Sequence, residues 1–545
     1  MSEELTLRPF FWRATRLFGE KSVVSHTHDG EHRYTYAGFG ERVTQFAAAL
    51  TSLGIGSGDR VGTIGWNTHR HFETYYAVPL LGAQLHTINL LLHDEHILHI
   101  INDAQDDVII VDAESVSTID RLWSDIDCVE DVIVFGTDIP ETDSDLPLHS
   151  YESLIEAHEP IESWPQLVED MPAGMCYTSG TTGPPKGVEY THKMIYAHAL
   201  MVMTPSALNI SESDVVMPVV PMFHVNSWEF PYAVTMAGAK QVYPGPSPDP
   251  SHLVSLIESE GVTLTAGVPT VWIDVLNYVT EHGGDLSSLD RIIVGGSAAP
   301  KDVMRRYEDE HDVTIEHAWG MTETMSIGSV SRPKTSMDEW DQHQQFTQRV
   351  KQGLLSPGLE MRVVDDSGNE ILWDGTEFGE LLVRGPSVVE SYYNLPEADT
   401  TDFVESDAGA DWLRTGDIAT VDEYGYIEIV DRSKDVIKSG GEWISSIDLE
   451  NTILSHEAVR EAAVIAAPHD RWQERPLAVV VPESTAELTV EELRDFLEET
   501  FPRWWLPDEV RFYDEIPKTA TGKLDKKVLR KEIDDPELPY APGEK

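Results

Sequence analysis

The chain is organised around residues 177–188, which read Tyr177-Thr178-Ser179-Gly180-Thr181-Thr182-Gly183-Pro184-Pro185-Lys186-Gly187-Val188. They follow an apolar run, 173–176, that predicts a buried strand ending at a loop. The loop glycines let the backbone approach a ligand closely, and the hydroxyl and N–H groups suit phosphate oxygens. Lys186 adds a positive charge suited to a leaving polyphosphate. The ordered mix of Ser/Thr, Gly and Lys argues against an ordinary surface loop.

The spacing of this loop differs from the Gly-x-x-x-x-Gly-Lys-Ser/Thr pattern of P-loop NTPases. In that pattern a serine or threonine follows the lysine, whereas here Lys186 stands between Pro185 and Gly187. The residues therefore indicate a phosphate-binding loop of another kind.

The composition is strongly acidic. The 545 residues include 95 acidic and 39 basic side chains, which gives a formal net charge of −56. Nucleic-acid binding and attachment to anionic lipid both need positive patches, so this charge argues against both. We interpret the charge as a salt-adapted surface, as in the cytosol of a halophile; a soluble acidic protein without such adaptation is the alternative.

The sequence predicts a cytoplasmic protein. Cys128 and Cys176 lie far apart and indicate no disulfide framework, which fits a reducing compartment. No apolar run reaches the roughly 18 residues of a membrane-spanning helix. The acidic N-terminus lacks the basic and apolar regions of a signal peptide.

Alternation of apolar strands and helical patterns predicts an α/β fold with parallel sheets. The expected helices are 39–53 and 491–500, and the expected strands are 61–66, 108–112, 131–136, 215–220, 264–268, 291–296, 313–316, 464–467, 477–482 and 509–513. Residues 358–430 have a β-rich texture, and 333–352 are polar and expected at the surface. Gly296 belongs to a small-residue turn at a strand end, where open α/β sheets bind ligands.

A second motif contains candidate ligand-binding residues and reads His317-Ala318-Trp319-Gly320-Met321-Thr322-Glu323-Thr324. Trp319 offers a flat face for a purine or an acyl group, and Thr322 offers a hydroxyl for phosphate. Glu323 offers a hard oxygen ligand for Mg²⁺.

Three further stretches complete the set. They read Trp412-Leu413-Arg414-Thr415-Gly416-Asp417, then Asp431 to Trp443 with Gly440-Gly441-Glu442-Trp443 at its end, and Pro517-Lys518-Thr519-Ala520-Thr521-Gly522-Lys523-Leu524. A single lysine is normally a solvated surface charge. Only the place of Lys523 in this ordered set points to function.

These five motifs, in this order over residues 177–523, resemble the adenylate-forming superfamily of acyl-CoA synthetases, luciferases and peptide-synthetase adenylation domains. The resemblance implies a large N-terminal domain, 1–431, made of two α/β subdomains and a β-rich subdomain. It also implies a hinge at 432–436 and a small mobile α+β C-terminal domain, 437–545. Most relatives have Tyr where Trp319 stands, which keeps the stacking face and leaves the hydrogen-bonding role of this position open.

The resemblance implies ATP, Mg²⁺ and coenzyme A as reactants and cofactors. The implied nucleotide-binding residues are Thr178, Ser179, Gly180, Thr181, Thr182, Gly183, Lys186, His317, Ala318, Trp319, Gly320, Thr322, Asp417, Arg432, Lys434, Lys438 and Trp443. The implied catalytic residues are Lys523, Glu323, Thr178 and His224, with Thr178 and Glu323 as metal ligands. The implied acyl-binding residues are Val225, Trp228, Gly296 and Gly320.

Individual roles follow from the same resemblance. Asp417 is the ribose carboxylate, Arg432 also contacts the nucleotide, and Lys434 is the pivot of the hinge. Lys523 bridges the substrate carboxylate and the α-phosphate. A homodimer is the candidate assembly.

The segment Pro221-Met222-Phe223-His224-Val225-Asn226-Ser227-Trp228 is most similar to medium- and long-chain fatty acyl-CoA synthetases. In those enzymes the matching tryptophan gates an apolar tunnel, whereas a core tryptophan is the alternative for Trp228. His224 is either a neighbour of the substrate carboxylate or a packed core histidine. Glu229 is expected to point away from the tunnel.

The predicted function is therefore ligation of a fatty acid to CoA through an acyl-adenylate, with release of AMP and pyrophosphate. The alternatives are an aryl or short-chain acid–CoA ligase, an adenylation domain, and a non-catalytic nucleotide-binding sensor.

Overall fold

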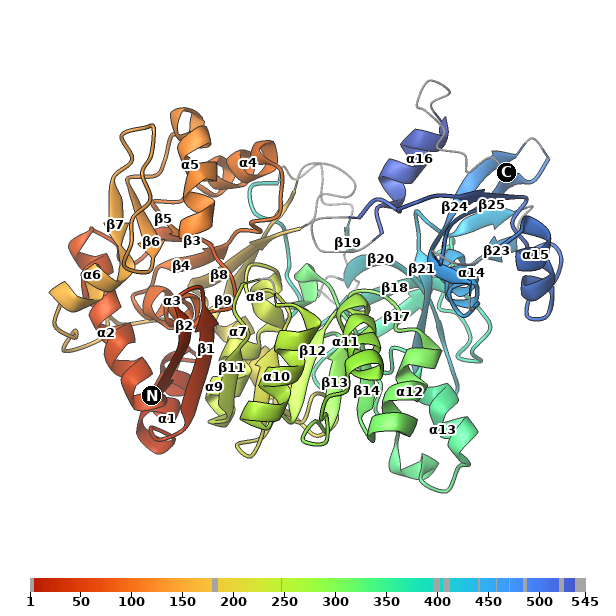
Figure 1. The fold of residues 1–545 in the computed structure, drawn as a ribbon, viewed down its shortest axis with the longest axis horizontal. Helices are drawn as coiled ribbons and strands as arrows, with labels where there is room; N and C mark the ends of the chain where they lie inside the picture. The colour runs from red at the N-terminus through yellow and green to blue at the C-terminus, as the bar shows by residue number, and fades with distance from the viewer. Residues whose placement is uncertain are drawn as a thin grey trace.

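The computed structural model describes residues 4–178, 185–246, 248–395, 402–404, 412–439, 442–456, 458–469, 471–483, 488–518 and 524–534. For residues 442, 443 and 532–534 the description covers the backbone alone. Within this part of the chain, four sheets and their helices define the fold (Figure 1).

The first sheet has seven strands, six of them parallel. Its order is β7 (Leu148–Ser150), β6 (Asp131–Phe135), β5 (Val108–Asp112), β3 (Arg60–Ile64), β4 (Gln84–Thr87), β8 (Pro172–Tyr177) and β9 (Gly187–Thr191). Strand β9 runs antiparallel to β8, so the loop between them is a hairpin connection. Continuous apolar strands such as β5 form here because helices cover both faces of the sheet.

The second sheet has nine strands. Its order is β16 (Leu354–Leu355), β15 (Ser329–Val330), β14 (Thr314–Trp319), β13 (Arg291–Val294), β12 (Leu264–Gly267), β10 (Val215–Pro218), β11 (Lys240–Tyr243), β1 (Ser22–Thr27) and β2 (Gly30–Thr35). The strands from β14 to β1 pair in parallel, and β2, β15 and β16 are antiparallel additions at the two edges. The carboxyl end of β14 therefore lies beside that of β13.

The two sheets share a central layer of helices. This layer comprises α1 (Arg8–Leu17), α2 (Tyr36–Ser52), α3 (His69–Leu80), α6 (Tyr151–Ala157), α7 (His192–Met203) and α9 (Phe230–Ala237). On the outer face of the first sheet lie α4 (Asp94–Ala104) and α5 (Val116–Leu122). On the outer face of the second lie α10 (Pro250–Glu260), α11 (Pro269–His282) and α12 (Lys301–His311). One core thus joins side chains from both sheets.

The short helices connect these layers. They are η1 (Ala113–Ser115), η2 (Trp123–Asp125), α8 (Val225–Trp228), η3 (Thr322–Thr324), η4 (Thr335–Met337) and α13 (Gln342–Arg349). The polar stretch 333–352 contains α13, in which Gln342, His343, Gln344 and Thr347 are exposed and Gln348 is buried. The stretch therefore lies at the surface, as its composition predicts.

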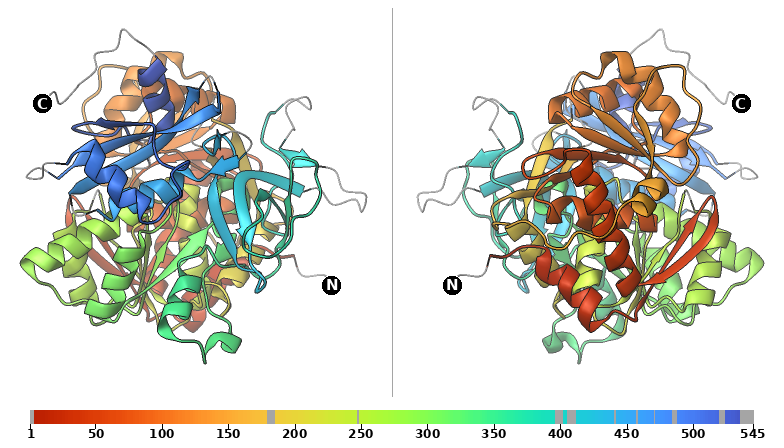
Figure 2. Two further views of the ribbon diagram at one scale, coloured as in Figure 1. Left: turned by 90° about the vertical axis from the view of Figure 1, so that its right-hand side faces the viewer. Right: turned by 90° about the vertical axis from the view of Figure 1, so that its left-hand side faces the viewer.

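A five-stranded sheet follows, made of β17 (Glu360–Val364), β18 (Gly379–Arg384), β20 (Trp412–Val421), β19 (Phe403–Val404) and β21 (Ile427–Arg432). It is antiparallel throughout. Figure 2 shows these teal strands as a lobe beside the blue C-terminal part. Strand β21 leads from this lobe directly into the C-terminal part.

The C-terminal part is a small α+β unit. Its strands are β22 (Ile437–Ser439), β23 (Glu442–Ile444), β24 (Val459–His469), β25 (Gln473–Pro482) and β26 (Glu509–Phe512). Its helices are α14 (Ser446–Leu454), α15 (Val490–Glu498) and α16 (Lys526–Asp534). Helices α14 and α15 pack on one face of the sheet, and Leu529 of α16 packs on the other.

The predicted fold class is confirmed: a large α/β and β-rich N-terminal part precedes a small, largely antiparallel C-terminal part. The predicted strand 108–112 matches β5, and the predicted 464–467 is the centre of the longer β24. Strand β24 is longer than predicted because its full length pairs with β25. Within the described residues, no helix combines the length and the apolar character that crossing a bilayer would need.

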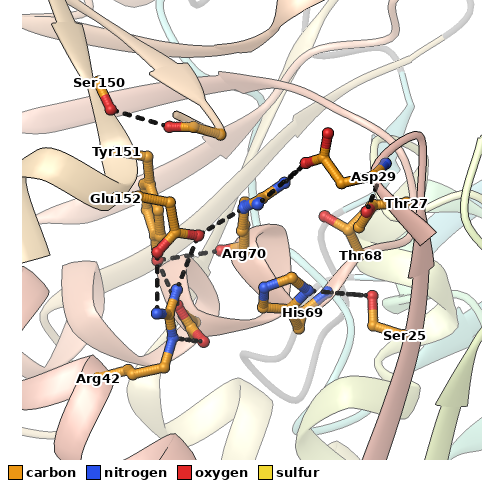
Figure 3. Close-up of polar contacts among 12 residues, drawn as sticks. Ser25, Thr27, Asp29, Arg42, Thr68, His69, Arg70, Ser150, Tyr151 and Glu152 are labelled. Atoms are coloured by element: carbon orange, nitrogen blue, oxygen red, sulfur yellow. Dashed lines mark hydrogen bonds and ion pairs between the residues drawn. The ribbon is translucent and has the colours of Figure 1, made fainter. Parts of the chain in front are cut away.

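A partly buried charge cluster joins α2, α3 and α6 in the central layer (Figure 3). The Arg42 guanidinium donates to Glu73 Oε1 at 2.7 Å and to Glu152 Oε2 at 2.9 Å. The Tyr151 hydroxyl donates to Glu73 Oε2 at 2.7 Å, and Arg70 Nε donates to Glu152 Oε1 at 2.7 Å. Because the Glu73 side chain is 0% exposed, its carboxylate depends on these partners for its solvation.

We expect Arg42→Met to destabilise the fold by about 3–5 kcal/mol, since it leaves the buried Glu73 carboxylate without its cation. The midpoints of urea and thermal unfolding measure this loss. Arg121→Met is the matched control, because Arg121 and Asp94 form an ion pair with side chains 55% and 45% exposed. An exposed pair of this kind contributes about 0–1 kcal/mol. Equal losses of unfolding free energy in the two variants would contradict the conclusion that Arg42 stabilises the fold by pairing with Glu73.

Candidate active site

The two ends of the predicted phosphate loop are held together. The Thr178 N–H donates to the Lys186 carbonyl at 2.9 Å, and the Lys186 N–H donates to Thr178 Oγ1 at 3.1 Å. These bonds continue the β8–β9 pairing by one step, so Thr178 and Lys186 face each other across the base of the loop. The predicted ligands Ser179, Gly180, Thr181, Thr182 and Gly183 lie outside the described residues.

The Lys186 side chain reaches across to the β-rich lobe. Its Nζ donates to Asp402 Oδ2 at 2.9 Å and lies 4.3 Å from the centre of the Tyr392 ring. An ammonium over an aromatic face is attracted by the ring quadrupole. The loop lysine is therefore held by one carboxylate and one aromatic ring.

Glu323 occupies η3, just beyond β14. It is 6% exposed, and its Oε1 accepts a hydrogen bond from the Tyr392 hydroxyl at 2.7 Å. Burial raises the pKa of Glu323, and the Tyr392 hydrogen bond opposes that shift. The neighbouring Thr322 carbonyl accepts a hydrogen bond from Tyr190 at 2.7 Å, which anchors the turn to β9. Tyr392 thus touches both Lys186 and Glu323.

Gly320 is required by the tight return of the chain after β14. A Cβ atom on Gly320 would lie 1.6 Å from the Ser326 carbonyl oxygen. A side chain there would have to push the 320–326 turn open. The glycine therefore serves the shape of the turn that carries Thr322 and Glu323.

A second cluster surrounds Asp417 on β20. The Trp319 Nε1–H donates to Asp417 Oδ2 at 2.7 Å, and Arg432 Nε donates to Asp417 Oδ1 at 2.8 Å. Asp417 is 2% exposed, whereas the Arg432 side chain is 44% exposed. The indole N–H therefore supplies the hydrogen bond that the sequence left open at this position. Trp319, Asp417 and Arg432, predicted from three separate motifs, lie together.

His317 and Ala318 lie on β14, and both are buried. His317 Nε2 accepts from the Ala299 N–H at 3.4 Å, and Nδ1 lies 3.0 Å from the Val350 carbonyl. Burial lowers the pKa of His317. The ring is thus a neutral imidazole that donates from Nδ1 to Val350. It holds the turn after β13 in which Gly296 lies.

Residues 225–229 form a left-handed turn, with φ between 42° and 62° at all five positions. Left-handed backbone costs L-residues roughly 1–2 kcal/mol each, so tertiary bonds must hold it. Ser227 Oγ donates to the Val220 carbonyl at 2.7 Å, and Thr87 Oγ1 donates to Asn226 Oδ1 at 3.1 Å. The turn places Trp228 Cη2 3.2 Å from where a Cβ of Gly295 would lie. Trp228 therefore lies against the small-residue turn that also contains Gly296.

Glu229 ends this turn and is fully buried. Its Oε1 accepts from Asn226 Nδ2 at 3.1 Å, and burial raises the pKa of Glu229 well above its usual range. Burial thus favours the neutral form of this carboxyl group. A neutral carboxyl can be buried in the apolar core that Trp228 shares, where a charged one could not.

His224 stands at the start of the same turn, and Val225 behind it is buried. His224, Phe223, Tyr177 and Thr178 line one small cavity. The predicted catalytic residues Thr178 and His224 are thus neighbours at the carboxyl end of β8.

The remaining predicted residues belong to the C-terminal part. Lys434 follows β21 in the turn before β22, and Lys438 lies on β22, where its N–H donates to Glu474 Oε2 at 2.7 Å. The Trp443 side chain and all of Lys523 lie outside the described residues.

Magnesium is the metal that the predicted ligands imply, and the donor set fits it. Among the described residues, no group of three or more His, Cys, Asp or Glu side chains could enclose a metal ion. Mg²⁺ needs no such cage, because it is normally held by one or two carboxylates, waters and substrate phosphates. The buried Glu323 carboxylate and the Thr178 hydroxyl would hold it.

Tyr392 and Asp402 are site residues that the sequence analysis missed. Tyr392 is 69 positions from Glu323. Neither Tyr392 nor Asp402 belongs to one of the five motifs. The sequence signal for this segment is an aromatic pair, Tyr392-Tyr393, within the β-rich stretch 358–430.

Comparison with known families identifies the chain. Residues 10–393 match the family described as AMP-binding enzyme, and residues 448–523 match the AMP-binding enzyme C-terminal domain. The chain belongs to the AMP-binding enzyme family. Two clusters, one around Asp417 and one around Glu323, therefore lie in an AMP-binding enzyme.

Individual AMP-binding enzymes resemble the chain over nearly its full length. It is 44% identical over 534 residues to a long-chain-fatty-acid–CoA ligase of Thermus thermophilus, covering 98% of this chain and 96% of that protein. It is 39% identical over 537 residues to a 3-methylmercaptopropionyl-CoA ligase of Ruegeria lacuscaerulensis, covering 98% of each. The crystal structure of the anthranilate CoA ligase AuaEII with anthranoyl-AMP matches with a TM-score of 0.86 and 26% identity, covering 97% of this chain and 98% of that one.

We expect Trp319→Phe to weaken AMP binding about tenfold, because it removes one of the two donors to Asp417 and hydrogen bonds to charged groups contribute about 1.5–3 kcal/mol. Isothermal titration calorimetry with AMP measures the change. Trp272→Phe is the control, since the indole N–H of Trp272 has no hydrogen-bond partner among the described residues. Unchanged AMP affinity in Trp319→Phe would show that the indole N–H plays no part in holding Asp417.

Proposed function

We propose that the chain is an AMP-forming fatty-acid–CoA ligase, an acid–thiol ligase that uses ATP, Mg²⁺ and CoA. The observation that carries this proposal is the 44% identity to a long-chain-fatty-acid–CoA ligase over 98% of the chain. The clusters around Asp417 and Glu323 support it, because one carboxylate can accept the ribose hydroxyls of a nucleotide and the other offers a hard oxygen ligand for Mg²⁺.

In the first half-reaction a carboxylate oxygen of the fatty acid attacks the α-phosphorus of ATP. The bond between the α- and β-phosphates breaks, and pyrophosphate leaves. Asp417 accepts the ribose hydroxyls, and Trp319 and Arg432 keep its carboxylate oriented. Lys186 and the loop after β8 hold the departing pyrophosphate, and Lys523 neutralises the charge at the α-phosphate. Catalysis is thus positioning and charge stabilisation.

Glu323 and Thr178 would hold Mg²⁺, which when bound neutralises charge on the polyphosphate. The roles of the loop residues 179–183 follow the same proposal: their N–H and hydroxyl groups surround the phosphates. His317 is part of the proposed nucleotide site, and it also holds the turn at Ala299 through the Ala299 N–H.

In the second half-reaction the CoA sulfur attacks the acyl carbonyl and AMP leaves, while the thiol proton passes to solvent. We infer that the C-terminal unit, 437–545, rotates on the 432–436 hinge between the two steps, with Lys434 as pivot. Lys438 and Trp443, which lie just beyond the hinge, then face the nucleotide and the CoA. The N-terminal domain in this proposal spans 1–431.

The acyl chain is proposed to enter beside Trp228. The left-handed turn places the Trp228 ring next to Gly295, and His224 and Val225 precede it in the same turn. We infer that Trp228 covers an apolar channel leading from Gly296 and Gly320, with His224 beside the substrate carboxylate. A cytoplasmic location, a homodimer and a salt-adapted surface remain part of the proposal, resting on composition and resemblance.

The similarity to a 3-methylmercaptopropionyl-CoA ligase at 39% identity favours a second candidate, ligation of a short acid. Both candidates share the adenylate chemistry and differ in the acyl site. The acid preference therefore separates them.

We expect AMP release to require both an acid and CoA, with KM falling along the series acetate, butanoate, octanoate and palmitate. Each buried CH₂ contributes about 0.8 kcal/mol, or about fourfold in affinity, until the channel is full. The panel also contains 3-methylmercaptopropionate and benzoate, and is run at about 0.1 M and about 2 M KCl because screening changes over that range. Preference for a short or aryl acid would reject the fatty-acid assignment, and no AMP with any acid would indicate a sensor.

Lys523→Ala should separate the half-reactions. We expect adenylate formation to fall by at least about a hundredfold, roughly 2.7 kcal/mol of barrier, because the lost charge is needed only while negative charge gathers at the α-phosphate. The CoA step, started from supplied acyl-adenylate, should keep most of its rate. Lys527→Ala, an exposed lysine on α16, is the control. Equal losses in both steps would contradict the proposed role of Lys523.

A further inference from the structure

The segment 388–394 connects the two loops of the candidate site by its backbone. The Val389 N–H donates to the Glu323 carbonyl at 3.0 Å, and the Tyr393 N–H donates to the Gly187 carbonyl at 2.8 Å. The segment therefore bonds on one side to the turn that carries Glu323 and on the other to the strand that follows Lys186. It fixes how far apart these two loops lie.

The Tyr392 side chain also connects the two loops, because it contacts a charged side chain from each. Its hydroxyl donates to Glu323 Oε1 at 2.7 Å, and its ring lies 4.3 Å from Lys186 Nζ. The ring is itself packed edge-on against Phe403, with 5.6 Å between ring centres. A rigid aromatic side chain, held from behind, thus contacts the predicted metal-binding carboxylate and the predicted phosphate-binding ammonium at once.

The hydrogen bond from Tyr392 is important for Glu323 because this carboxylate is buried. The carboxylate is almost fully buried, and among the described residues no lysine, arginine or histidine forms an ion pair with it. The other charged groups nearby are Asp402, which pairs with Lys186, and Arg432, which pairs with Asp417. Within the described part of the chain, the Tyr392 hydroxyl is therefore the side-chain donor that orients Glu323.

We propose that Tyr392 is a positioning residue for metal and polyphosphate binding. It orients the Glu323 carboxylate through its hydroxyl and holds the Lys186 ammonium over its ring, so that both meet the bound polyphosphate at a fixed separation. This rests on the proposed function, which assigns Glu323 to Mg²⁺ and Lys186 to pyrophosphate. Groups that hydrogen-bond metal ligands from behind commonly change metal affinity about tenfold or more when removed.

Tyr393 provides a matched control within the same segment. Its hydroxyl accepts a hydrogen bond from Arg60 at 3.3 Å, and its ring lies 4.7 Å from the Arg60 guanidinium. It therefore makes the same two kinds of contact to a side chain outside the candidate site. Substitutions at Tyr393 report what loss of such contacts does to the segment alone.

The experiment measures ATP binding by isothermal titration calorimetry without any acid, so that no turnover occurs. Titrations are made with EDTA and over a series of Mg²⁺ concentrations. For Tyr392→Phe we expect unchanged ATP affinity in EDTA and an Mg²⁺ requirement raised about tenfold, because the ring stays and the hydroxyl is lost. Tyr392→Leu should also weaken ATP binding in EDTA, since Lys186 loses the ring. Tyr393→Phe should change neither quantity.

The double variant Glu323→Gln/Tyr392→Phe closes a thermodynamic cycle. If Tyr392 acts through Glu323, the double variant needs the same Mg²⁺ concentration as Glu323→Gln alone. Three outcomes would overturn the proposal. The shifts in Mg²⁺ requirement could be additive in the double variant, or Tyr392→Phe could need the same Mg²⁺ concentration as the unaltered chain. Alternatively, Tyr392→Phe and Tyr393→Phe could show equal shifts. Ligase activity of the unaltered chain is assayed separately, so a failure of the proposed function is recognised independently of Tyr392.

Discussion

The rest of this structure depends on one constraint: the seven-stranded and nine-stranded sheets pack against the same layer of helices. Side chains from β3, β4 and β5 of one sheet and from β10, β12 and β13 of the other enter the same core, with α2, α3 and α9 between them. The shared layer fixes the distance and angle between the sheets. Because functional loops follow the carboxyl ends of strands in both sheets, it also fixes where those loops meet. The buried pair of Arg42 and Glu73 lies inside this layer and links its helices.

The candidate site uses buried carboxylates in a chain of net charge −56. Each is stabilised by specific donors. Asp417 has an indole N–H and a guanidinium, Glu323 has a phenol hydroxyl, and Glu229 has an amide N–H. A buried charge without such partners costs several kcal/mol. Each of these three buried acids therefore has at least one specific hydrogen-bond donor from a neighbouring side chain.

The turn at 225–229 shows how tertiary bonds override local preference. Val225 and Trp228 favour extended or right-handed backbone, yet both adopt the left-handed region. Hydrogen bonds from Thr87 and Ser227 and the buried Asn226–Glu229 pair hold them there. The turn places the Trp228 ring against Gly295. The strained backbone therefore determines where this ring lies.

The sequence by itself determined the fold class and the order of the elements. Buried parallel strands such as β5 are apolar on both faces, and their short length and β-branched residues such as Val108 and Ile109 distinguish them from buried helices. It also determined the five motifs, since Thr178, Glu323, Asp417 and Arg432 belong to short stretches whose chemistry is local. Only the tertiary structure decided that the Trp319 indole reaches Asp417 and that Tyr392 joins Glu323 to Lys186. These contacts join residues far apart in the chain, and loop closure between such residues is set by packing of the whole core, which no local pattern encodes.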